Sequence, residues 1–169
     1  MDYSYSLKIA KDRVGVLIGP KGEVKNSLEA STGCKININS SDAEVKITGE
    51  DPLKLYSLKN TISAIGRGFN PDIAQSLLKQ DYMLELIHLK EFVNEKQLPR
   101  VKGRIIGTGG KSRRTIEELT ECNISVYGKT VAIVGRIDSV SLARQSIELL
   151  LKGANHSTVF RMLEKRKNR

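Results

Sequence analysis

The stretch Leu17-Ile18-Gly19-Pro20-Lys21-Gly22 returns 88 positions later as Ile105-Ile106-Gly107-Thr108-Gly109-Gly110. The residues that follow keep the same offset, so that Leu28, Thr32, Cys34, Ile36 and Ile38 match Ile116, Thr120, Cys122, Ile124 and Val126. A later match, of Val45–Gly49 with Val131–Gly135, has an offset of 86 because the second copy has a shorter loop. An ordered set of matches of this kind indicates an internal repeat. The chain therefore consists of two related modules.

Each module has the same predicted order of elements, β-α-α-β-β-α. Alternation, helical spacing and turn residues predict the strands 3–9, 35–39 and 44–48 and the helices 13–18, 23–32 and 52–65 in the first copy. The second copy repeats them as strands 83–89, 123–127 and 129–134 and helices 99–106, 111–121 and 139–152. We expect the first strand of each copy to be half-buried, with Tyr3, Tyr5 and Leu7 on one face and Leu84, Leu86 and His88 on one face. A connecting helix (71–79) and an amphipathic terminal helix (157–167) complete the chain.

The two glycine loops are the candidate binding sites. Glycine allows positive φ and removes the Cβ, so that a ligand can approach the backbone closely. The helix that follows each loop directs unpaired N–H groups and its positive dipole end toward the loop, which favours phosphate. Lys21 and Lys25 accompany the first loop, and Arg104, Lys111, Arg113 and Arg114 accompany the second. The alternative is a tight turn between helices that serves packing alone.

Charge is distributed unevenly between the copies. The chain has 28 basic and 19 acidic residues, a net charge of +9 and an isoelectric point near 9.6. Residues 1–69 have a net charge of +2, and residues 70–169 have +7. This excess indicates a polyanionic partner and makes the second copy the expected stronger binder. The cations that crowd residues 161–169 have two open interpretations, a binding surface or a solvated helix face.

Several classes of protein are excluded. No apolar run is long enough for a transmembrane helix, and the N-terminus has no signal-peptide pattern, so a cytoplasmic protein is expected. Cys34 and Cys122 are 88 residues apart and suit small buried groups better than a disulfide or a zinc site. Gly107–Ser112 resembles a phosphate-binding P-loop, but Ile105 stands where that motif needs glycine. We therefore expect no enzymatic activity, metal or cofactor.

The Gly-X-X-Gly loops, each followed by a strand pair and a long helix, resemble those of type I KH domains. This resemblance implies an α+β fold of two tandem KH domains, residues 1–69 and 70–169, the second with the linker helix and the basic C-terminal helix. In KH domains the loop clamps the backbone of single-stranded RNA. Bases would then lie in an apolar groove, lined by Val14, Ile18 and Ile36 in copy one and by Ile105, Ile106 and Ile124 in copy two. The residues expected to bind RNA are Gly19, Pro20, Lys21, Gly22, Lys25, Arg104, Ile106, Gly107, Thr108, Gly109, Gly110, Lys111, Arg113 and Arg114.

The segments Ile-Gly-Arg-Gly-Phe (65–69) and Lys-Gly-Ala-Asn-His-Ser (152–157) narrow the resemblance. They are similar to those of a two-KH assembly factor of the small ribosomal subunit in archaea and eukaryotes. The resemblance implies binding near the 3′ end of small-subunit rRNA during rRNA processing. It also implies two protein partners, the nuclease that matures this end and the alpha subunit of the initiator-tRNA-carrying translation factor. An intact first glycine loop and the lack of a long N-terminal extension resemble archaeal members, and we expect a monomer.

Two other functions compete with this interpretation. A KH-fold adaptor could link a translation or processing factor to the ribosome with only non-specific nucleic-acid binding, and the weakly charged first copy suits that role. Single-stranded DNA is also open as a ligand, because no residue reports on a 2′-hydroxyl. Aromatic residues are only 5% of the chain, so base contacts are expected to be aliphatic more than stacked.

Overall fold

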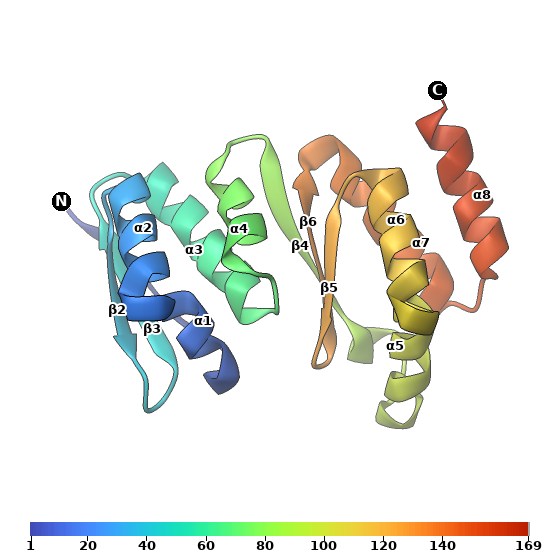
Figure 1. Cartoon of the computed structure of the whole chain (residues 1–169), viewed down its shortest axis with the longest axis horizontal. Coiled ribbons are helices and arrows are strands. Elements are labelled where there is room, and N and C mark those ends of the chain that lie inside the picture. Colours follow the sequence, from blue (N-terminus) through green and yellow to red (C-terminus); the bar gives the residue numbers. More distant parts are fainter. Residues whose placement is uncertain (169) are drawn as a thin grey trace. The chain divides into compact units, whose positions relative to one another are not determined.

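The computed structural model describes residues 1–168, and the chain forms two compact units that divide between Tyr82 and Met83 (Figure 1). The sequence-based boundary lay earlier, between residues 69 and 70. The difference arises because α4 (Pro71–Ala74) and the 3-10 turn η3 (Gln75–Leu78) pack on the long helix of the first unit, and Ala74 and Leu77 are buried there. The expected linker helix is therefore part of the first unit.

The first unit has the predicted β-α-α-β-β-α order. Its elements are β1 (Tyr3–Lys8), α1 (Val14–Ile18) after the turn η1 (Lys11–Arg13), the glycine turn η2 (Pro20–Gly22), α2 (Glu23–Thr32), β2 (Lys35–Asn39), β3 (Glu44–Gly49) and α3 (Pro52–Gly66). Pro52 is the first residue of α3, and Asp51 before it is the N-cap. The Asp51 carboxylate accepts the N–H of Leu53 at 3.0 Å.

The first sheet is antiparallel, with strand order β1-β3-β2. Val45 and Ile47 of the central strand are fully buried, and Ile36 of β2 lies opposite Ile47. The expectation of a half-buried first strand is wrong for Tyr3 and Tyr5, which are 46% and 36% exposed. Both tyrosines lie on β1, an edge strand that pairs with β3 along one side only.

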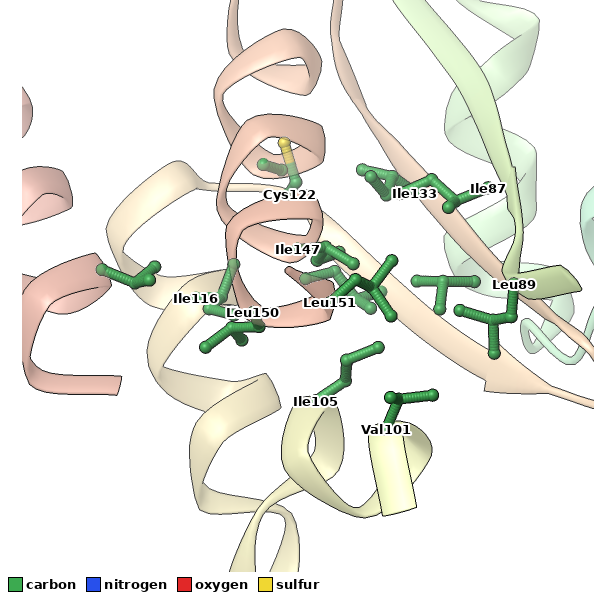
Figure 2. Packing of buried hydrophobic residues seen from close by; sticks show 14 of the residues in the cluster. Ile87, Leu89, Val101, Ile105, Ile116, Cys122, Ile133, Ile147, Leu150 and Leu151 are labelled. Atoms are coloured by element: carbon green, nitrogen blue, oxygen red, sulfur yellow. The ribbon is translucent and has the colours of Figure 1, made fainter. Parts of the chain in front are cut away.

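The second unit repeats this order with insertions. Its elements are β4 (Tyr82–His88), the turns η4 (Leu89–Glu91) and η5 (Glu95–Gln97), α5 (Leu98–Ile106), the glycine turn η6 (Thr108–Gly110), α6 (Lys111–Thr120), β5 (Asn123–Tyr127), β6 (Thr130–Arg136), α7 (Ile137–Leu151) and α8 (His156–Lys167). The strand order β4-β6-β5 is that of the first sheet. The core lies between sheet and helices, where Ile105, Ile116 and Ile147 meet Ile87 and Ile133 (Figure 2).

The predicted facing of β4 is wrong. Ile87 and the following Leu89 are buried in the core, and the half-buried Met83 packs against it. Leu84 and Leu86 are half-buried without joining this core, and His88 is exposed. Both sets of alternate positions contain apolar residues, so alternation did not distinguish the two faces. The core-facing side also carries Glu85, whose carboxylate pairs with Arg144 of α7.

Candidate nucleic-acid interface

The two glycine loops have the same backbone conformation. Gly19 and Gly107, which end α1 and α5, have φ of 76° and 75° with ψ of 170° and 173°. Two positions later, Lys21 and Gly109 have φ of 54° and 61°. The last loop residue of each copy, Gly22 or Gly110, is left-handed too, with φ of 77° and 80°. Three positive-φ residues within four positions explain why each loop is rich in glycine, although Lys21 adopts this conformation in the first loop.

The first glycine is also needed for space. A Cβ at Gly107 would lie 2.7 Å from the backbone nitrogen of Ser112, and one at Gly19 would lie 2.8 Å from that of Val24. Neither contact can be relieved by a rotamer change because the atom approached belongs to the backbone. The loop is therefore pressed against the first turn of the following helix. No side chain among the described residues caps that turn in either copy.

The loops differ in the number of donors they can offer. Pro20 has no backbone N–H, whereas Thr108 at the same position has one. Thr108 and Gly109 are exposed in the second loop. Backbone N–H groups at a helix start bind phosphate oxygens, so the second loop is better equipped for an anion than the first.

Of the cations predicted at the loops, Lys21, Lys111 and Arg114 are exposed and have no salt bridge among the described residues. The guanidinium of Arg114 lies over the second loop, since a Cβ at Gly110 would come within 3.0 Å of its Nη1 atom. This arrangement places one flexible cation directly beside the loop. Lys111 begins α6 immediately after it.

Lys25 and Arg113 are partly engaged within the fold. Lys25 pairs with Glu29 at 3.3 Å, and at the equivalent place Arg113 pairs with Glu117 at 2.8 Å. The second carboxylate oxygen of Glu117 accepts the backbone N–H of Ile124 at 2.8 Å. Glu29 accepts the backbone N–H of Ile36 in the same way at 2.9 Å, so each glutamate joins the helix to the next strand and holds a cation in place.

Arg104 has a different role from the one predicted. Its guanidinium donates to the carbonyl oxygens of Leu150 at 2.9 Å and Ala154 at 2.6 Å. Leu150 lies in the last turn of α7, where backbone oxygens lack helical partners, and Ala154 lies in the segment that follows the helix. Arg104 is therefore a helix cap, and its charge is not directed to the loop.

The six residues predicted to line the apolar grooves differ in how deeply they are buried. Ile18 and Ile106, which precede the first glycine of each loop, are half-buried. Ile105 is fully buried, and Val14, Ile36 and Ile124 are between 4% and 6% exposed. Only the isoleucine next to each loop therefore offers apolar surface to a base, and the others are core residues.

The difference in net charge between the two structural units is larger than that between the two modules divided after residue 69. Residues 1–82 contain 11 basic and 10 acidic residues, a net charge of +1. Residues 83–169 contain 17 basic and 9 acidic residues, a net charge of +8. Some of the second unit's cations are neutralised locally: hydrogen bonds from Lys129 and Lys90 lower the pKa of Glu95 to about 2. Lys111 and Arg114, beside the loop, have no acidic partner among residues 1–168.

Other kinds of site find no support in the described part of the chain. Every described helix is too short or too polar to cross a bilayer. No three described His, Cys, Asp or Glu side chains gather in a group that could hold a metal ion.

Comparison with known proteins agrees with this geometry. A model of the eukaryotic-type, type I KH domain, that of the second KH domain of PNO1, matches residues 83–168, and a general KH-domain model matches residues 4–64. A KH domain-containing protein of Methanocaldococcus jannaschii is 46% identical over 168 residues, covering 96% of this chain and 74% of the relative. The chain belongs to the KH-domain family that includes PNO1 and Dim2p. KH proteins of this family bind RNA and are not enzymes, which agrees with the sequence-based expectation.

More distant and structural relatives of this KH family give the same result. The pre-rRNA-processing protein PNO1 of Chaetomium thermophilum is 32% identical over 60% of this chain, which spans only 41% of that protein. Dim2p of Pyrococcus horikoshii, in a crystal structure titled as a complex with a/eIF2alpha and rRNA, is 44% identical with a TM-score of 0.94. The alignment covers 99% of this chain and 95% of that one. Two tandem KH domains, as the glycine loops predicted, are thus confirmed.

Proposed function

We propose that this KH protein binds single-stranded RNA from the 3′ region of small-subunit rRNA during ribosome assembly, chiefly through the glycine loop of its second unit. The loop clamps the RNA backbone, and the bases lie against the apolar surface beside it. No step of chemistry is needed for this role. The protein acts by holding the RNA in one conformation.

One observation carries this proposal: the second loop combines left-handed glycines with exposed cations that have no acidic partner among residues 1–168. Lys111 and Arg114 lie beside Thr108 and Gly109, in a unit of net charge +8. Phosphate is the ligand that backbone N–H groups and free cations bind together. In the first unit, Pro20 removes a donor and the net charge is only +1.

The names of the relatives support the choice of ligand and partners. Pre-rRNA processing is named for PNO1, and a/eIF2alpha and rRNA are named for the Dim2p complex. By this likeness we infer that rRNA and the alpha subunit of the initiator-tRNA-carrying factor are partners of this chain. We also propose the nuclease that matures the rRNA 3′ end as a partner, and a monomer acting in the cytoplasm.

Fluorescence anisotropy tests the proposed ligand. The full chain is titrated against an RNA copied from the 3′ end of small-subunit rRNA, a scrambled RNA and the matching DNA, each at two salt concentrations. We expect tight binding to the first RNA alone, with a salt slope that rises by about 0.7 for each phosphate contacted. Equal weak binding to all three would contradict the proposal.

Such a result would favour the second candidate, a protein-interaction adaptor. The first unit carries the surface for this role, because Leu53 and Tyr56 of α3 are 70% and 52% exposed. Lys59 lies over the rings of both Tyr5 and Tyr56, at 4.8 and 5.8 Å from their centroids. Exposed aromatic and aliphatic side chains of this kind favour contact with protein.

A further inference from the structure

We propose that the exposed face of α8 is a second RNA-binding surface, which holds phosphates of the same strand beyond the segment clamped by the glycine loop. This proposal rests on the proposed function and adds a site to it. We call this surface the α8 face and define it by Thr158, Arg161, Met162, Lys165 and Arg166, which line one surface hollow.

The opposite side of α8 is fully used by the fold. Val159 and Leu163 have no exposed surface, and they belong to the core of the second unit. The helix packs against α6 and α7 through them. The amphipathic pattern predicted for this helix is therefore satisfied within the unit, and the apolar side is not available to a partner.

The α8 face presents charge that the fold does not use. Arg161, Lys165 and Arg166 are exposed, and none of their side chains has an ion pair or hydrogen bond among residues 1–168. Elsewhere in this unit, cations such as Arg113 and Arg144 are paired with glutamates. Three unpaired cations on one face of a helix repel one another, which costs stability unless an anion joins them.

The helix dipole explains the presence of only some of the cations on the α8 face. Cations in the last turn, here Lys165, Arg166 and Lys167, interact favourably with the helix dipole. Arg161 lies more than a turn earlier, where the dipole effect has fallen off. Thr158, Arg161 and Lys165 follow helical spacing, so they form one stripe that continues toward the start of the helix.

Two contacts place α8, whose outer side carries this stripe, beside the elements that flank the second glycine loop. The Nε2 atom of His156, at the start of α8, lies 2.7 Å from the carbonyl oxygen of Arg104, three residues before the glycine loop begins. Near the other end, the ammonium of Lys167 donates to the carbonyl oxygen of Glu118 in α6 at 3.4 Å. The helix thus runs beside α6 for about 18 Å, starting near the loop (Figure 1).

The chemistry of the α8 face favours RNA over other anions. A helix that binds a membrane surface needs a free apolar side, and the apolar side of α8 is buried. Met162, half-buried, is the one apolar residue among the five that line the hollow. Flexible cations and a threonine hydroxyl suit phosphates, and the same unit already has a phosphate-binding loop.

The test is the triple variant Arg161→Gln, Lys165→Gln and Arg166→Gln, measured in the full chain. Its matched control removes three exposed, unpaired lysines of the first unit, with Lys8→Gln, Lys46→Gln and Lys54→Gln. Each protein is titrated against an RNA of four nucleotides, the length one KH domain clamps, and against one of about twelve. A polyglutamate peptide serves as a non-nucleic anion.

We expect the triple variant to bind the longer RNA about tenfold more weakly, with a salt slope lower by about 2, while binding of the four-nucleotide RNA and the thermal midpoint stay unchanged. The control should bind both RNAs like the wild type. Equal loss in variant and control, no loss in the variant, or loss only toward polyglutamate would overturn the proposal. If the wild type itself bound neither RNA, the proposed function would fail instead.

Discussion

At the residue scale, each cysteine is matched to a glycine on the neighbouring strand. A Cβ on Gly135 would lie 2.5 Å from the sulfur of Cys122, and one on Gly49 would lie 2.6 Å from that of Cys34. Both cysteines are buried, and burial raises the pKa of the Cys122 thiol. The prediction from the sequence, small buried groups with no disulfide, is therefore explained by a contact that leaves room for a sulfur but not for a further methyl group.

This contact gives a prediction for stability. Gly135→Ala should lower the free energy of unfolding by about 1–3 kcal/mol, because the added methyl overpacks the core against Cys122. Urea unfolding measures the loss. Adding Cys122→Ala to the variant should recover part of it, since removal of the sulfur frees the space. Gly103→Ala, whose Cβ would meet nothing within 4 Å on a helix, is the control and should not destabilise. Additive losses in the double variant would contradict the contact.

At the element scale, an arginine side chain caps the C-terminal end of each long helix, α3 and α7. The two arginines do not occupy equivalent positions in the repeat. Arg13 donates to the carbonyl oxygens of Ile65 and Phe69 at 2.8 and 2.7 Å, as Arg104 does to those of Leu150 and Ala154. Arg13 precedes its glycine loop by six residues and Arg104 by three, a difference of about one helical turn. The two units thus make the same pair of hydrogen bonds with arginines from different positions of the repeat.

The second prediction separates this cap from the binding loop. Arg104→Gln should lower the free energy of unfolding by about 1.5–3 kcal/mol, because the C-terminal end of α7 loses charged hydrogen bonds, and the folded protein should bind RNA as before. Arg114→Gln should do the opposite, weakening RNA binding with little change in unfolding. Urea unfolding and anisotropy on both variants make the comparison. An RNA-binding loss in Arg104→Gln equal to that in Arg114→Gln would return Arg104 to the interface.

The same scale shows how far the sequence could predict this protein. The repeat and its turn residues predicted the elements and both loops, because local spacing and glycine conformation determine them. Arg104 was misplaced because proximity in sequence to Gly107 does not reveal the distant carbonyls of α7. The α4 segment was assigned to the wrong side of the boundary for a similar reason, since its packing on α3 is a tertiary contact. These two features depend on contacts distant in sequence, whereas the facing of β4 was missed because both of its faces carry apolar residues.

At the scale of the whole molecule, the two KH units share one fold but differ in charge and in loop chemistry. The first has a net charge of +1 and a proline in its loop, and the second has +8 and a loop whose residues all have N–H groups. The repeat therefore keeps the scaffold and changes the surface. We infer a division of labour, in which the second unit holds RNA and the first is free to contact protein.

The most direct test of this account is to make both loops acidic, one at a time, in the full chain. Thr108→Asp with Gly109→Asp should weaken binding of the rRNA 3′-end oligonucleotide at least tenfold, because a negative loop repels phosphate. The isosteric pair Thr108→Asn with Gly109→Asn keeps the shape without the charge and tolerates the left-handed position, so it should bind far more tightly than the Asp pair. Pro20→Asp with Lys21→Asp in the first loop should change affinity only slightly. An equal or greater loss from the first loop, or equal affinities for the Asp and Asn pairs, would contradict the claim that the second loop clamps the RNA backbone.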